Sequence, residues 1–199
     1  MFDSARCIIE NCSSSSWASS GYCRVHHPDV PGHEKAKIDE LLREPGLIEY
    51  QDYSGFDFQN LDLSNREFRY CRFSRANFTE TVLDGTHFLL CILDDIEARN
   101  CSLKGSRMMS VMAAGAVLTG ADLSGSDLIN INFNGIGGRS TVFDGSDLFY
   151  SRFIGAGLAD SSFQDCNLKR VDFSSAYMQG VDFTDSNPEE AYLMEGETE

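Results

Sequence analysis

The sequence has little of what membrane, secreted and nucleic-acid-binding proteins need. No apolar run approaches the length of a membrane-spanning helix, and residues 1–6 lack a basic stretch followed by an apolar one. We therefore expect a cytoplasmic protein with no membrane partner. Basic residues are also scarce, because 16 Lys and Arg stand against 31 Asp and Glu, for a net charge of −15. Such a charge repels nucleic acid, so direct binding of DNA or RNA is not expected.

Arrangements of residues typical of catalysis are also missing from the sequence. Between residues 51 and 186 the only histidine is His87, and no Ser, Cys or Lys lies beside a base at a recognisable spacing. We predict that the protein is not an enzyme and has no catalytic residues.

What the sequence does have is a strict period of five. From Phe58 to Phe183, every fifth position gives 26 sites, of which 11 are Phe, 10 Leu and 2 Met; only Ala98, Ala113 and Gly138 depart. The residue two places before each site is Ala, Ser, Thr, Cys or Val in 20 of the 26 cases. This period fits neither a helix nor an isolated strand, but it fits a chain that turns a corner every five residues.

The corner residue of each unit supports this interpretation. It lies two places after the large residue and is Gly at nine positions and Asn at four, and both residue types tolerate the positive φ of tight turns. Four sides would close a coil of about 20 residues, so the repeat predicts roughly six or seven stacked coils.

The repeat resembles the Ala-(Asp/Asn)-Leu-X-X pattern of pentapeptide-repeat proteins. The resemblance is clearest at 76–78, 121–125, 126–128, 146–148 and 181–183. It implies an all-β solenoid, a right-handed quadrilateral β-helix, over residues 51–186. Atypical units at 92–98, 108–116 and 135–139 keep the period, and there we expect local bulges or a bent face.

Four of the seven cysteines belong to the repeat. Cys71, Cys91, Cys101 and Cys166 all take the small inward position, so we interpret them as compact buried fillers. Cys71 and Cys91 lie one predicted coil apart, but a reducing compartment argues against a disulfide between them.

The other three cysteines precede the repeat and lie close to two histidines. Cys7, Cys12, Cys23 and His26 give four ligands within 20 residues, which suits tetrahedral zinc. The segment 21–27 also resembles the end of small Cys-Cys-Cys-His zinc modules, and that signature favours His26 over His27. Four protein ligands leave no open position, so the site would be structural. The alternative is a flexible leader with free cysteines.

These observations divide the chain into four parts. We predict a zinc-binding module at 1–33, a capping helix and linker at 34–50, the β-helix at 51–186, and a short C-terminal helix with an acidic tail at 187–199. A helix over 33–44 would lay its apolar residues Ile38, Leu41 and Leu42 on the open first coil, and residues 47–53 would continue this cover. The C-terminal helix looks too short to seal its end, so pairing with a second subunit is expected there.

Four arginines, Arg66, Arg69, Arg72 and Arg75, stand out on an early coil of this acidic protein. Local ion pairs are the simplest expectation, with Arg66 directed at an acid of the capping segment. An anionic ligand or partner is the alternative.

Two functions remain open from the sequence. The first is a non-enzymatic scaffold that binds an unidentified protein partner. The second comes from the family resemblance, because some pentapeptide-repeat proteins mimic DNA, bind type II topoisomerases such as DNA gyrase and give quinolone resistance. Acidity concentrated in residues 121–199, with 14 acids and 4 bases, favours this alternative. A third, weaker option is an adaptor whose zinc module contacts nucleic acid. For none of these functions does the sequence identify the residues that bind the partner.

Overall fold

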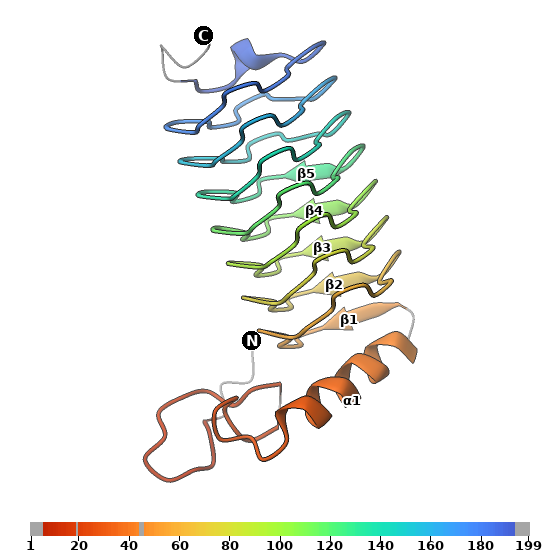
Figure 1. Ribbon diagram of the computed structural model, residues 1–199, viewed down its shortest axis with the longest axis vertical. Coiled ribbons are helices and arrows are strands. Elements are labelled where there is room, and N and C mark those ends of the chain that lie inside the picture. The colour runs from red at the N-terminus through yellow and green to blue at the C-terminus, as the bar shows by residue number, and fades with distance from the viewer. Residues whose placement is uncertain (1–5, 19, 44–45, 194–199) are drawn as a thin grey trace.

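The computed structural model describes residues 6–18, 20–43 and 46–193, and it shows a four-sided parallel β-solenoid (Figure 1). Each bridge of the solenoid joins residues 20 apart, and bridges start at every fifth residue, as in Asp52 with Arg72 and Asp57 with Asn77. Four sides of five residues therefore make one coil. On one side the bridges step from Asp52 to Tyr192 at a constant interval of 20 residues. This confirms the architecture predicted from the period.

On one side of the solenoid the bridges extend into a five-stranded parallel sheet, ordered as the chain runs. Its strands are β1 (Leu47–Glu49), β2 (Glu67–Arg69), β3 (His87–Leu89), β4 (Arg107–Met109) and β5 (Asp127–Ile129).

The core is a column of stacked side chains. Phe133, Phe153 and Phe173 stack with ring centroids 5.0 and 5.2 Å apart, because identical positions of successive coils lie at the strand spacing. Rings on opposite sides of the coil meet edge to face, as in Phe143 and Phe153 at 88°. All of these side chains are buried.

The small inward residues also satisfy buried backbone groups. The hydroxyls of Thr81, Ser146 and Ser151 each donate to the carbonyl 23 residues earlier, at 2.7 to 2.8 Å. The Cys91 and Cys166 thiols make the same contact with Phe68 and Phe143. A short polar side chain at this position therefore costs little, because its hydrogen bond replaces the one it made to water.

The three atypical segments keep the 20-residue register, so the expected bulges do not occur. Bridges run through them without a shift, as in Ile92 with Met112 and Val117 with Gly137. An exchange of residue sizes explains the kept register. At Gly138, where a large residue is usual, an added Cβ would lie 3.0 Å from Leu158. Two places earlier, where a small residue is usual, the chain has Ile136. Ile96 stands before Ala98 in the same way. The large and small residues have exchanged places within one side, so the core volume is kept.

The first coil is covered by helix α1 (Val30–Arg43), which lies at the foot of the stack in Figure 1. The helix begins three residues before the predicted start, because the Asp29 carboxylate accepts a hydrogen bond from the Gly32 N–H at 2.9 Å and caps it. Leu41 is buried and Ile38 packs on the core as expected, whereas Leu42 is exposed. The predicted end at Glu44 lies outside the described residues.

The cover continues through only part of the predicted segment. Ile48 and Tyr53 pack into the core, but Leu47 and Tyr50 are each 49% exposed. The Arg66 guanidinium donates hydrogen bonds to the carbonyl oxygens of Leu41 and Leu42, at 2.6 and 3.3 Å, among other contacts. Arg66 therefore contacts the C-terminal end of α1, where the helix dipole is negative. The sequence analysis did not predict this contact.

The C-terminal end differs from the predicted helix. Within residues 187–193 the structure has one 3-10 turn, η1 (Pro188–Glu190), and the Asn187 side chain accepts from the Leu168 N–H instead of capping this turn. Tyr192 then pairs with Asp172, because its N–H bonds to the Val171 carbonyl at 2.8 Å. Strand pairing with the coil below therefore outweighs helix continuation here. The rest of the predicted tail, 194–199, lies outside the described residues.

The column predicts a sharp contrast between buried and surface phenylalanines. Phe163→Ala should lower the free energy of unfolding by about 3–5 kcal/mol, because it opens a cavity between stacked rings. Phe149→Ala, at a half-buried outward position, should cost far less. Denaturant unfolding followed by circular dichroism measures both, and equal losses would contradict the stacked core.

Candidate functional site

The first candidate site is a cluster of metal-ligating side chains in the N-terminal module. The ligand atoms of Cys7, Cys12, Cys23 and His26 all lie within 4.8 Å of one another. His26 Nδ1 is 3.5 Å from the Cys7 sulfur and 3.4 Å from the Cys23 sulfur, and the Cys12 and Cys23 sulfurs are 3.8 Å apart. The structure therefore brings all four predicted residues together in an arrangement that could hold a metal ion.

Short turns place these four side chains. The N–H of Cys12 bonds to the Ile9 carbonyl, and the N–H of His26 bonds to the Cys23 carbonyl, so each half of the site is a tight loop. The neighbouring His27 takes a different role. Its Nδ1 accepts from the Asp29 N–H at 3.1 Å, and its ring packs against Trp17 and His33.

The cluster also changes the acidity of its own groups. Burial opposes ionisation of Cys7, but hydrogen bonds from the backbone of Cys23 and Ile9 and from His26 outweigh it and lower its pKa to about 6. Contacts with the Cys7 and Cys12 thiols raise the pKa of His26. A thiolate beside an imidazolium is therefore favoured, and such a thiolate is the form that binds a metal.

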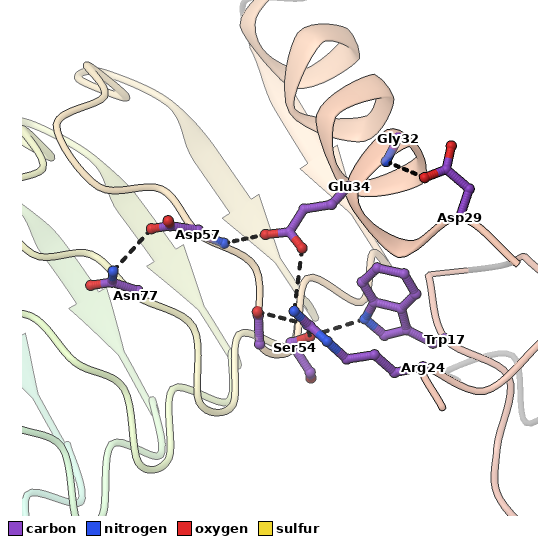
Figure 2. Close-up of polar contacts among 9 residues, drawn as sticks. Trp17, Arg24, Asp29, Gly32, Glu34, Ser54, Asp57 and Asn77 are labelled. Atoms are coloured by element: carbon purple, nitrogen blue, oxygen red, sulfur yellow. Dashed lines mark hydrogen bonds and ion pairs between the residues drawn. The ribbon is translucent and has the colours of Figure 1, made fainter. Parts of the chain in front are cut away.

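The module is anchored to the solenoid by Trp17, Arg24 and Glu34 (Figure 2). The Trp17 indole N–H donates to the Ser54 carbonyl at 3.0 Å, and Arg24 donates to the Ser54 and Gly55 carbonyls at 3.2 and 2.6 Å. Glu34 accepts from the Asp57 N–H and forms an ion pair with Arg24 at 3.3 Å. These three side chains satisfy backbone groups of the first coil that have no coil beneath them.

The sequence analysis missed this anchor. Only two signals could have indicated it: Trp17 is the single tryptophan of the chain, and Arg24 interrupts the ligand segment between Cys23 and His26.

The second candidate is the outer surface, where the four sides differ in chemistry. We define the acidic side as the outward residues of units 62–65, 82–85, 102–105, 122–125, 142–145, 162–165 and 182–185. It carries seven aspartates and one base, Lys104. Hydrogen bonds from Ser64 lower the pKa of Asp62, and those from Thr184 and Gln164 lower that of Asp182. These two carboxylates therefore stay ionised below their usual titration range.

The next side, which carries β1–β5, is apolar. We define the apolar side as the outward residues of units 47–50, 67–70, 87–90, 107–110, 127–130, 147–150 and 167–170. Tyr50, Leu90, Met109 and Tyr150 are 46 to 52% exposed here, and Tyr50 stacks on Tyr70.

Charges on the apolar side balance, because it holds four acids and four Lys and Arg residues. Arg69 pairs with Glu67 and Arg107 with Asp127, at 2.5 and 3.0 Å. The linear sequence gave the charge along the chain but not this division between sides.

The repeat and the coil together define a solenoid of pentapeptide units. The family model described as pentapeptide repeats matches in 8 copies, over residues 57–95, 91–135 and 151–187. The chain belongs to the pentapeptide-repeat family.

Among solved structures, two forms of QnrB1, a plasmid-mediated fluoroquinolone resistance protein, resemble this chain. Both were trypsin-treated and are 25% identical to it. One has a TM-score of 0.66 and covers 78% of this chain and 83% of QnrB1; the other has 0.59, with 77% and 80%. No curated protein matches the chain in sequence. In the described part of the chain, no helix has the length and apolar character needed to cross a membrane.

The two groups of cysteines should differ in reactivity. Burial raises the pKa of Cys101 to about 12 and that of Cys166 to about 11, whereas the pKa of Cys7 is about 6. In metal-free native protein at pH 7.5, iodoacetamide should label Cys7 and Cys12, whose pKa values are lowered by hydrogen bonds, and spare Cys101 and Cys166. Labelling of Cys7 should slow as the pH falls below 6, because its thiolate becomes protonated. Peptide mass spectrometry reads both effects, and uniform labelling would refute them.

Proposed function

We propose that this protein is a non-enzymatic scaffold that binds another protein through the outward residues of its solenoid, with a structural zinc site in residues 1–33. The apolar side is the observation that supports binding. In a chain of net charge −15 it is neutral and exposes large apolar and aromatic side chains in four of its seven units. Exposed apolar surface of this kind is typical of protein interaction sites.

Met109 and Met112 offer a matched test of this role. Both are 46% exposed, but Met109 lies on the apolar side and Met112 on the neighbouring side. Met109→Glu should abolish capture of the partner from native lysate, because it places a charge within the apolar contact, whereas Met112→Glu should retain it. Quantitative mass spectrometry of the two pull-downs measures this. Equal capture by both variants would contradict an apolar binding side.

A second candidate is binding to a type II topoisomerase such as DNA gyrase by mimicry of DNA. Two observations favour it: the acidic side presents a fixed row of carboxylates along a rod, and the solenoid is similar to QnrB1. One observation weakens it, since within residues 46–193 no loop longer than a turn projects from the coils.

A gyrase supercoiling assay tests the second candidate. If it holds, the protein should inhibit supercoiling or protect gyrase from a quinolone at micromolar concentration. The double variant Asp165→Lys with Asp185→Lys should lose this effect, because it reverses charges on the acidic side. Glu80→Lys with Asp160→Lys, at corner positions of another side, is the control. If the unmodified protein has no effect on gyrase, the topoisomerase candidate is rejected and the scaffold proposal is unaffected.

The geometry of the ligand cluster supports zinc as the metal. A tetrahedral site with Zn–S near 2.3 Å and Zn–N near 2.0 Å has ligand edges of about 3.8 Å between sulfurs and about 3.5 Å between sulfur and nitrogen. Three of the six ligand distances agree: 3.8 Å between the Cys12 and Cys23 sulfurs, and 3.5 and 3.4 Å from His26 to the Cys7 and Cys23 sulfurs. All six lie within 4.8 Å. Cys7, Cys12, Cys23 and His26 would hold the ion, and its binding would stabilise a module with only a small apolar core.

Adjacent histidines give a matched test of the zinc site. His26→Ala should lower zinc affinity by about 100-fold or more, because it removes a ligand, and His27→Ala should keep one zinc per chain. Competition with a chromophoric chelator measures the affinity, and elemental analysis gives the stoichiometry. Equal loss of zinc from both variants would reject His26 as the ligand.

Pairing of two subunits through the C-terminal end remains a prediction. Val181, Phe183 and Leu193 are only partly buried in the last described coil, so a second subunit would find apolar atoms there. A molar mass near that of one chain by light scattering at micromolar concentration would contradict it.

A further inference from the structure

A cleft of about 620 Å³ lies where the N-terminal module meets the first two coils. Its charged lining residues are Arg24 from the module and Asp52, Arg72 and Arg75 from the solenoid. Its size falls within the range of small-ligand pockets.

Serine residues line both walls of this cleft. Ser15 and Ser16 belong to the module, and Ser54 and Ser74 belong to successive coils. Guanidinium and hydroxyl groups are hydrogen-bond donors suited to an oxyanion.

The arginines are fixed in place to different degrees. Arg24 is held against Trp17, with its guanidinium carbon 4.9 Å from the ring centroid, and against the Gly55 carbonyl. Gly55 makes room for it, because a Cβ there would lie 2.5 Å from the Arg24 Nη1. Arg72 pairs with Asp52 at 3.7 Å. Arg75, exposed at a corner, makes no ion pair with any described residue.

Charge at the cleft runs against the charge of the protein. Three arginines and one aspartate give the lining residues a net charge of +2, or +1 when Glu34, the ion-pair partner of Arg24, is counted, whereas the whole chain carries −15. A phosphate monoester, with about −1.5 to −2 charges at pH 7 and three acceptor oxygens, complements this lining.

We propose that this cleft binds a phosphoryl group, carried either by a small phosphate ester or by a phosphorylated side chain of a partner protein. Arg75 supplies the arm that is free to close on the ligand, and Arg24 supplies a fixed wall. The site does not depend on the scaffold or topoisomerase proposals.

The same surroundings disfavour a nucleobase or a long nucleic acid. Trp17 is only 5% exposed, and its ring packs against Phe56, His33 and Arg24, so no face is left for a base to stack on. An extended phosphate backbone leaving the cleft would also meet the carboxylates of the solenoid.

Trp17 lines the cleft and is the only tryptophan, so its fluorescence reports on the site. Full-length, zinc-loaded protein is titrated with inorganic phosphate, O-phosphoserine, and a phosphoserine decapeptide beside its unphosphorylated form. Potassium chloride at matched ionic strength is the blank. We expect a saturable change in emission, with matching heat by calorimetry, for the three phosphorylated probes alone. If the phosphopeptide binds tenfold more tightly than phosphoserine, the natural ligand is a phosphorylated protein. If the two bind equally, it is a small phosphate ester.

Two arginine variants show whether the response comes from the cleft. Arg75→Ala should weaken phosphate binding about tenfold, because it removes one charge-assisted contact. Arg170→Ala is the control, since Arg170 is also exposed at a corner with φ 60° but lies near the opposite end. Melting curves should show that both variants fold. Absence of both saturable heat and emission change, or equal weakening in the two variants, would overturn the proposal.

Discussion

Backbone pairing of residues 20 apart is the constraint on which the rest of the structure depends. In each unit one N–H bonds upward and the next bonds downward, as when Phe78 donates to the Glu97 carbonyl and Asn77 to the Phe56 carbonyl. To return to this register the chain must turn at every fifth residue. All 26 corners from residue 60 to 185 have positive φ, yet only 13 are Gly or Asn. An ordinary residue there costs about 1–2 kcal/mol, so stacking must outweigh local preference at Tyr70, Leu90 and Arg170.

This constraint explains how much could be predicted from the sequence. The inward residues repeat because every coil has the same interior, so the fold and the buried cysteines were visible from spacing alone. The ends follow no period, and there the predictions were weaker. The early start of α1 depends on the Asp29 cap, and the short η1 depends on Tyr192 pairing with the coil below. The clustering of Cys7, Cys12, Cys23 and His26 was predictable because their spacing is itself a pattern, whereas the contacts of Trp17 and Arg66 are tertiary.

A uniform interior leaves the outward residues free to vary, and this freedom is where function can reside. Inward changes must conserve volume, as the exchange between Ile136 and Gly138 illustrates. Outward positions have no such restriction, and their chemistry sorts by side: aspartates gather on one, and apolar residues on the next. Because the coil is rigid, side chains 20 residues apart stand in a fixed row. A partner protein can therefore read a row of charges or apolar groups with little ordering cost.

The ends must solve a different problem, since the first coil has backbone groups with no coil below. An apolar cover alone would leave these groups without hydrogen bonds, at a cost of about 1–3 kcal/mol each. Trp17, Arg24 and Glu34 supply the missing partners, which requires charged and polar residues at the junction. A metal ion on the neighbouring ligands would hold the loop that carries Arg24. The same requirement that closes the solenoid thus places an arginine against the coils, beside Arg72 and Arg75, and gives this acidic protein a local basic cleft.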